Sequence, residues 1–414
     1  MTLTDNNKTG SAWNRILLVA ASLAAMLVTS TAGAAVAGSE GQTFSLYAEE
    51  GYISVADGGS IYSWGYTDTG TMQLPGPTLI VTAGVEVSVT LTNNLPVAAG
   101  NVSIVFPGQD VTAVAGTGVP GDLVQEAQTG GSVTYTFTPQ VPGTYQYHSG
   151  SQPDLQVEMG LYGALIVRPA AATDACTVEP STTAGVSGRA YDHPDACYDR
   201  EYLYLLSEID IDIHQAAEAQ ITGSDPIVLP AGAYQSEYWL MNGRAGPDSM
   251  AADGNEILPY QPYGSLTRMH PGERILVRVV GAGREMHPFH THGNHVRLLA
   301  RDGRMLVTDS GALAGPELFT IPSLPGGTAD AIFQWTGEEL GWDIYEANSS
   351  VTVDDGTGTG STITRPHECL DNDGDGFADA DSDYPWEWCA DHNEPIPVNL
   401  PSLSSLAFGG FYSG

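Results

Sequence analysis

Short runs in which apolar and polar residues alternate, bounded by glycine or proline, recur along most of this chain. They lie at 79–91, 132–138, 143–148, 163–167, 201–213, 238–242, 274–280, 295–300 and 329–335. Alternation with a period of two is typical of half-buried strands, because successive side chains of a strand point to opposite faces. With 49 glycines, 26 prolines and no long amphipathic helix, the sequence predicts an all-β protein built from β-sandwiches.

The strand signals form two groups, separated by a different kind of sequence. Residues 171–199 are rich in Ala, Thr, Asp and Gly, so we expect them to link a first domain at 38–170 to a second at 200–350. Residues 351–414 begin with a Gly- and Asp-rich stretch, and we expect them to form an acidic C-terminal insert and end segment. A chain of 414 residues is long enough for two or three domains with separate cores.

The first 37 residues have the organisation of an export signal. Lys8 and Arg15 precede an apolar stretch at 16–28, and small residues follow, with Ala35-Val36-Ala37 as a cleavage site. The apolar stretch is too short to span a bilayer, and no later segment is a transmembrane candidate. We therefore expect a mature protein without a membrane span, in the periplasm or outside the cell.

The chain is strongly acidic. Asp and Glu number 49 against 14 Lys and Arg, for a net charge of −35. A surface of this charge repels nucleic acids and anionic membranes, so we expect neither as a partner.

The four cysteines form two pairs that are each close in sequence. Cys176 with Cys197, and Cys369 with Cys389, each enclose a polar loop. In an exported protein these pairs predict two loop-closing disulfides. Thiolate ligation of a metal is the alternative, and it is weakened because no cysteine lies beside a histidine pair.

Four of the ten histidines fall within the nine residues 287–295. His290 and His292 are two apart, so on a strand both rings leave the same face and can meet one metal ion. His287 lies just outside this pair, next to a proline that stiffens the backbone. Such clustering favours a metal site over solvent-facing histidines, but imidazole alone suits copper, zinc, iron or nickel.

A second metal motif lies in the acidic insert. Asp371, Asp373, Asp375, the carbonyl of Phe377 and Asp379 place oxygen atoms at alternate positions, with Gly376 at the sixth, as in a calcium-binding loop. The twelfth position is Ser382, so the usual bidentate glutamate is absent, although neighbouring aspartates could replace it. The alternative is a disordered acidic loop held by Cys369 and Cys389.

Three segments resemble those of the multicopper oxidase family. They are Leu74-Pro-Gly-Pro-Thr-Leu-Ile, Gly160-Leu-Tyr-Gly-Ala-Leu-Ile-Val, and the histidine motif from 287 to 293. The resemblance covers most of residues 43–345 and implies two cupredoxin-like Greek-key β-sandwich domains. It also implies copper: His287 matches a blue-copper ligand, while His290 and His292 match ligands of the oxygen-reducing copper cluster.

The chain departs from the family at the remaining ligands. Val105 and Pro107 stand where the family has its first histidine pair, and Tyr147-His148-Ser149-Gly150 keeps only the first member of the second pair. The closing His-Cys-His segment is not found within these 414 residues, so the resemblance implies a divergent member of the family; the alternative is a member truncated at its C-terminus, with the remaining ligands beyond residue 414. The resemblance therefore implies a smaller pocket, in which His148 of the first domain faces His290 and His292 of the second.

These observations support two hypotheses of different kinds. The first is a secreted copper-binding oxidoreductase homologue of the multicopper oxidases with an incomplete copper complement, acting on a small reductant such as a phenol or a metal ion. Homo-oligomers, common among two-domain cupredoxin proteins, are compatible with it. The second is a non-catalytic metal-binding or surface protein on the same scaffold. A copper nitrite reductase would require cysteine where this chain has Ser149.

Overall fold

The structure is a computed structural model of the chain. It describes residues 35–170, 176, 188–345, 367–379, 381–384 and 387–395, together with the backbone of 351–353 and 361–363. The export signal expected at 1–37 lies almost wholly outside the described residues. No helix within the described part is long and apolar enough to cross a membrane.

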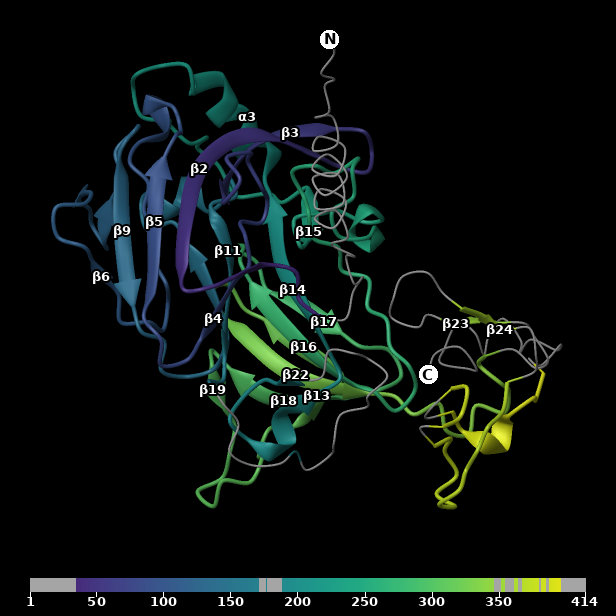
Figure 1. Cartoon of the computed structure of the whole chain (residues 1–414). Coiled ribbons are helices and arrows are strands. Elements are labelled where there is room, and N and C mark those ends of the chain that lie inside the picture. Colours follow the sequence, from purple (N-terminus) through teal and green to yellow (C-terminus); the bar gives the residue numbers. More distant parts are fainter. Residues whose placement is uncertain are drawn as a thin grey trace, which may run out of the picture.

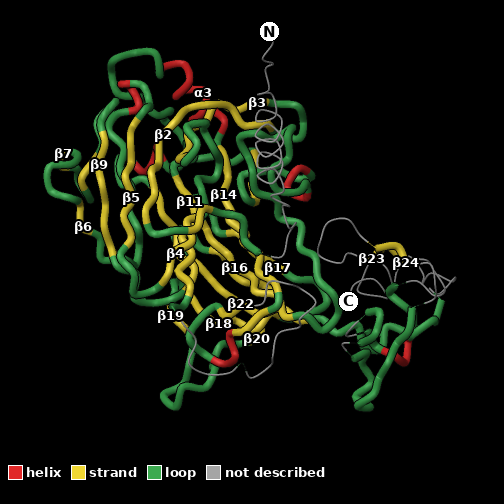
Figure 2. The backbone as a smooth tube through the Cα atoms, viewed as in Figure 1, coloured by secondary structure: helices red, strands yellow, loops and turns green. Residues whose placement is uncertain are grey.

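The first domain is a sandwich of two mixed sheets (Figures 1 and 2). One sheet has the order β1 (Ser39–Glu40), β4 (Leu79–Thr82), β11 (Tyr162–Arg168), β10 (Gly143–His148). The other has the order β3 (Ser60–Thr67), β2 (Thr43–Ser54), β5 (Val87–Asn93), β9 (Ser132–Phe137), β6 (Thr112–Ala113). A short hairpin, β7 (Val119–Pro120) with β8 (Gln125–Glu126), and the 3-10 turn η1 (Val97–Ala99) complete it.

The second domain is built on a seven-stranded sheet. Its order is β15 (Tyr238–Met241), β14 (Arg200–Ile209), β16 (Arg274–Gly281), β22 (Thr328–Gln334), β18 (Val296–Arg301), β19 (Arg304–Met305), and β20 (Glu317–Leu318) pairs with β18. A separate two-stranded sheet, β17 (His287–His290) with β21 (Thr320–Ser323), carries part of the histidine motif. A 3-10 turn, η3 (Asp248–Met250), lies in the long connection after β15.

The alternating pattern produces buried sheet faces as predicted. In β5 every second residue is buried, and these side chains join the core between the two sheets of the first domain. The pattern at 79–91, however, is divided between β4 and β5, which belong to different sheets. Gly84 lies between them with a φ of +76°, a left-handed conformation that glycine adopts without steric cost.

The run predicted as a strand at 201–213 ends earlier than expected. It forms β14 and then helix α3 (Ile211–Gln220), because the Asp210 side chain accepts hydrogen bonds from the backbone N–H groups of Asp212 and Ile213. Ile213 and Ala217 of this helix pack into the core of the first domain, so α3 bridges the two domains (Figure 1). A shorter helix, α2 (Pro153–Gln156), follows β10.

The two domains share both an apolar core and a buried ionic network. Leu74 and Tyr162 of the first domain pack in one cluster with Leu205 and Val280 of the second. Between β10, β16 and β22, the carboxylate of Asp330 accepts a hydrogen bond from the Thr144 hydroxyl at 2.6 Å. The domains are therefore joined by a contact that resembles a protein interior.

The connecting segment and the C-terminal insert are each held by a disulfide. Cys176 is bonded to Cys197, and Cys369 to Cys389, so both predicted pairs are confirmed. The first segment contributes β12 (Gly188–Arg189), β13 (Cys197–Tyr198) and η2 (Pro194–Ala196), and the C-terminal part contributes β23 (Val351–Val353), β24 (Ser361–Ile363) and η4 (Cys389–Asp391). Figure 1 shows the C-terminal insert in yellow, beside the sheet of the second domain.

Candidate metal centres

His287 lies at the start of β17, where a buried carboxylate fixes the loop that precedes it. The Glu208 carboxylate, 3% exposed, accepts hydrogen bonds from the backbone N–H groups of Arg284 and Glu285, and its Oε2 lies 2.9 Å from His287 Nε2. A Cβ atom on Gly283 would lie 2.0 Å from Oε2 of Glu208, so a larger residue there would displace this carboxylate. Because a carboxylate accepts, His287 donates from Nε2.

His290 ends the same strand, and His292 lies close to it in the bend that follows. Their ring centroids are 5.2 Å apart and both residues are exposed. The prediction placed both on one strand, but β17 ends at His290 and His292 stands in the bend that follows. Nδ1 of His290 is 2.8 Å from the Thr320 hydroxyl on β21, and its Nε2 has no hydrogen-bond partner among the described residues, so this nitrogen can accept a metal.

His148 ends β10 and is partly buried. Its Nδ1 lies 2.9 Å from the carbonyl oxygen of Ser149. A carbonyl only accepts, so Nδ1 carries the proton and Nε2 keeps the lone pair that a metal requires. Burial lowers the pKa of His148, with the Ser149 carbonyl acting in the opposite sense. The ring is therefore neutral at pH 7.

These imidazoles do not form one closed pocket within a single chain. Among the described residues, His148, His290 and His292 are not a set whose ligand atoms lie within 4.8 Å of one another. All four cysteines are used in disulfides, so this chain has no free thiolate for a blue copper. Ser149, which stands where a nitrite reductase would need cysteine, donates instead to Gln156. The assignment of these histidines to copper stays a prediction.

The predicted calcium loop is only partly assembled. Carboxylate oxygens of Asp371, Asp373 and Asp375 lie within 4.8 Å of one another, and all three residues are exposed. Asp379 is not a member of this group; its carboxylate accepts a hydrogen bond from the backbone N–H of Asn372. The alternate spacing thus brings together the first three predicted ligands.

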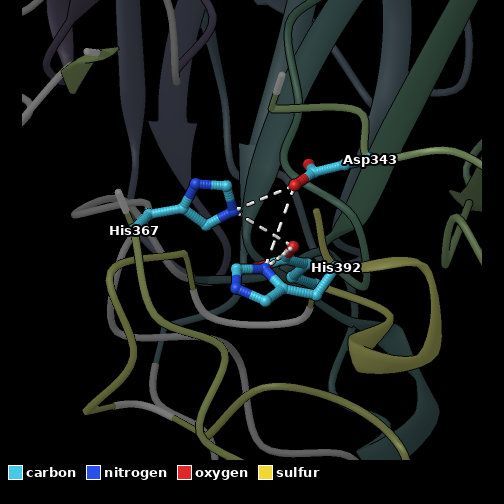
Figure 3. Close-up of side chains that lie close together, drawn as sticks. Asp343, His367 and His392 are labelled. Carbon is cyan, nitrogen blue, oxygen red and sulfur yellow. Dashed lines mark hydrogen bonds and ion pairs between the residues drawn. The ribbon is translucent and has the colours of Figure 1, made fainter. Parts of the chain in front are cut away.

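Four side chains that the sequence analysis did not select meet beside the C-terminal insert. Asp343, His367, Glu387 and His392 offer ligand atoms that all lie within 4.8 Å of one another (Figure 3). His367 and Glu387 each stand two residues before a cysteine of one disulfide, and His392 stands three after Cys389. The closeness of His367, Glu387 and His392 to the two cysteines of one disulfide is the sequence signal that could have identified these three residues. No such signal marks Asp343.

Comparison with known proteins gives a consistent family but partial coverage. Residues 57–172 match the family model described as multicopper oxidase. A multicopper oxidase of Talaromyces pinophilus is 37% identical over 98 residues, 23% of this chain and 15% of that protein. A probable nitrite reductase–hydroxylamine oxidoreductase fusion protein of Kuenenia stuttgartiensis is 24% identical over 240 residues, 56% of this chain and 22% of that protein.

Solved structures are also similar. A blue copper oxidase from Nitrosomonas europaea superposes with a TM-score of 0.49 at 21% identity, covering 71% of this chain and 75% of that one. By contrast, the matched part of this chain spans less than a quarter of the two curated relatives named above, 15% and 22% of their lengths.

Proposed function

We propose that this chain, whose first domain matches the multicopper oxidase family, is a copper-binding oxidoreductase with fewer coppers than a complete family member. The observation that carries the proposal is the exposed pair His290 and His292, whose rings lie 5.2 Å apart. Clustered neutral imidazoles are the donors that copper prefers.

His290, His292 and His148 are the proposed ligands of one copper, with His287 beside them as a further nitrogen donor. Support comes from hydrogen bonds that hold one ring nitrogen of His290 and His148 and leave the other available. Partners of this kind orient metal-binding histidines and select their tautomer. A bound copper would supply one-electron redox chemistry at this position.

Within one chain, His148 does not lie close enough to His290 and His292 to be the third ligand of the proposed copper. We propose a homo-oligomer in which His148 of one copy approaches His290 and His292 of the next. The exposure of the pair supports this arrangement, because exposed ligands with open positions can be completed from outside the chain.

The incomplete copper complement follows from the cysteines. A blue copper requires a thiolate, and the sulfur atoms of Cys176, Cys197, Cys369 and Cys389 are all committed to disulfides. Within this chain, electrons would therefore enter directly at the imidazole-bound copper. This makes single-electron oxidation of a small reductant the reaction that the donor set suits best.

The proposed substrates are phenols or reduced metal ions, and the proposed location is the periplasm or the cell exterior. The net charge of −35 supports cationic reductants, because an acidic surface raises the local concentration of cations. The export-like segment at 1–37 and the two disulfides support the location.

Copper binding and turnover test the proposal together. The mature protein is loaded first with zinc and then with Cu²⁺, and electron paramagnetic resonance is recorded alongside oxygen uptake with a phenol. We expect nitrogen-coupled Cu²⁺ signals and turnover that the double substitution His290→Ala/His292→Ala removes.

The matched control is His295→Ala, which removes an exposed histidine of the same segment whose ring stacks on Phe319. This variant should keep both copper and turnover. Equal copper signals in the double variant and the unsubstituted protein would contradict the assignment of the site. Copper without turnover would contradict the proposed activity alone.

We also propose that Asp371, Asp373 and Asp375 begin a calcium site with the Phe377 carbonyl and Asp379. Three carboxylates within 4.8 Å repel one another, and a divalent cation would relieve that repulsion. Terbium luminescence is the test: the lanthanide should bind the unsubstituted protein and lose affinity in Asp373→Asn. Unchanged binding would refute the site.

A further inference from the structure

The cluster of Asp343, His367, Glu387 and His392 joins the second domain to the C-terminal insert. Asp343 follows the last strand of the domain, while the other three residues flank the Cys369–Cys389 disulfide. Asp343 and Glu387 are each 2% exposed and His367 is 3% exposed. Figure 3 shows the two imidazoles and the Asp343 carboxylate turned toward a common centre.

The distances within the cluster match those of a tetrahedral metal site. Nε2 of His367 is 3.2 Å from Glu387 Oε1 and 3.4 Å from Asp343 Oδ2. Nδ1 of His392 is 2.9 Å from the same Glu387 oxygen and 3.9 Å from the same Asp343 oxygen. Four ligand atoms about 2.0 Å from a central zinc would stand about 3.3 Å apart, in the middle of this range.

The negative charge of the cluster also favours binding of a cation. Two carboxylates are buried here, and among the described residues neither forms an ion pair with arginine or lysine. With both imidazoles neutral, the cluster carries two negative charges away from water, which is costly unless a positive charge compensates them. A divalent ion bound by these four groups would bring the net charge to zero.

Two buried atoms of the cluster have no hydrogen-bond partner among the described residues. They are Oε2 of Glu387 and Nδ1 of His367. An ion at the centre would allow Glu387 to bind through both oxygens. A cavity with room for about one water-sized sphere is lined by Trp342, Asp343, Glu387 and Asp391, among others.

The surroundings orient the Asp343 carboxylate. The backbone N–H groups of Tyr345 and Asn393 donate to the two oxygens of Asp343 at 2.8 and 2.9 Å. The two imidazole planes are nearly perpendicular, at 84°, with centroids 4.6 Å apart.

We propose that these four residues bind one zinc-class divalent transition ion, which fastens the C-terminal insert to the second domain. Nitrogen donors exclude Ca²⁺ and Mg²⁺ as the preferred occupants, and two histidines with two carboxylates are a donor set suited to Zn²⁺. The site is distinct from the histidine motif at 287–295 and does not depend on the proposed redox function.

Cobalt substitution tests the proposal on the full mature protein. After treatment with a chelator, the protein is titrated with Co²⁺, and the visible absorption that distinguishes tetrahedral from octahedral Co²⁺ is recorded. We expect about one tetrahedral Co²⁺ per chain, displaced by one Zn²⁺. His392→Gln should weaken binding on the order of 100-fold or more, since it removes a direct ligand.

His295→Ala serves as the matched control, because it removes an exposed histidine that is a ligand in neither proposed site and should leave the cobalt spectrum unchanged. Absence of a tetrahedral spectrum in the unsubstituted protein would overturn the proposal, and this arm does not depend on the folding of any variant. An unchanged spectrum in His392→Gln would also overturn it. Loss of the signal in the control would reassign the ion to the histidine motif.

Discussion

Glu158 should make the stability of the protein depend on pH. Its side chain is 2% exposed, and burial raises its pKa from 4.5 to about 7, although the Asp210 N–H and the nearby Arg284 act in the opposite sense. Its Oε1 accepts from the Asp210 N–H at 2.8 Å, and its Oε2 lies 3.2 Å from Arg284. Arg284 belongs to the loop that leads into His287.

The direction and size of the effect follow from the raised pKa of Glu158. A carboxyl whose pKa is higher in the folded state stabilises that state fully below pH 4.5, and the contribution is lost as the pH rises through about 7. The pKa of Glu158 differs between the unfolded state (4.5) and the folded state (about 7), and each pKa unit corresponds to about 1.4 kcal/mol. This difference corresponds to about 3 kcal/mol of folding free energy. The protein should therefore lose about that much free energy of unfolding from this group between pH 4.5 and pH 8.

Glu158→Gln isolates the contribution, because glutamine keeps an oxygen that can accept from Asp210 but carries no titrating proton. Urea unfolding of both proteins at several pH values gives the difference in free energy of unfolding. Other titrating groups cancel in that difference, so the variant should gain relative to the unsubstituted protein as the pH rises. A difference that stays constant from pH 5 to pH 8 would refute the argument.

Two further mutagenesis experiments test a buried ion pair and a disulfide. Arg278→Met should lower the free energy of unfolding, measured with urea, by about 3–5 kcal/mol, because the fully buried Glu201, 2.9 Å away, would lose a cationic partner. The control is Arg297→Met, which removes one member of an exposed ion pair and should lower the free energy of unfolding by less than about 1 kcal/mol. Equal effects would contradict this account. Replacing Cys176 and Cys197 by serine removes a disulfide that closes a loop with a sequence separation of 21, and it should lower the free energy of unfolding by about 3 kcal/mol. Calorimetry of the variant and of the disulfide-bonded protein measures this difference. No difference would show that the disulfide does not restrain the unfolded chain.

Local pattern predicted most of the strands of four or more residues, since alternation of apolar and polar residues is what one buried sheet face requires, but it did not predict β2, β3 or β21. Its failures are local too. The run at 79–91 is split because Gly84 turns the chain from one sheet into the other, and the run at 201–213 becomes helical once Asp210 caps the next segment. Both signals are single residues, which a search for periodicity does not register.

The sequence by itself determined the all-β class, both disulfide pairs and the closeness of His290 to His292, because each depends on residues near one another in the chain. Only the tertiary structure decided that His148 stays outside that pair within one chain and that Asp343 meets His367, Glu387 and His392. Contacts between distant segments depend on how whole sheets and loops pack, and no local pattern encodes that packing. The cluster of Asp343, His367, Glu387 and His392 has the most complete set of ligands, and the sequence shows only part of it.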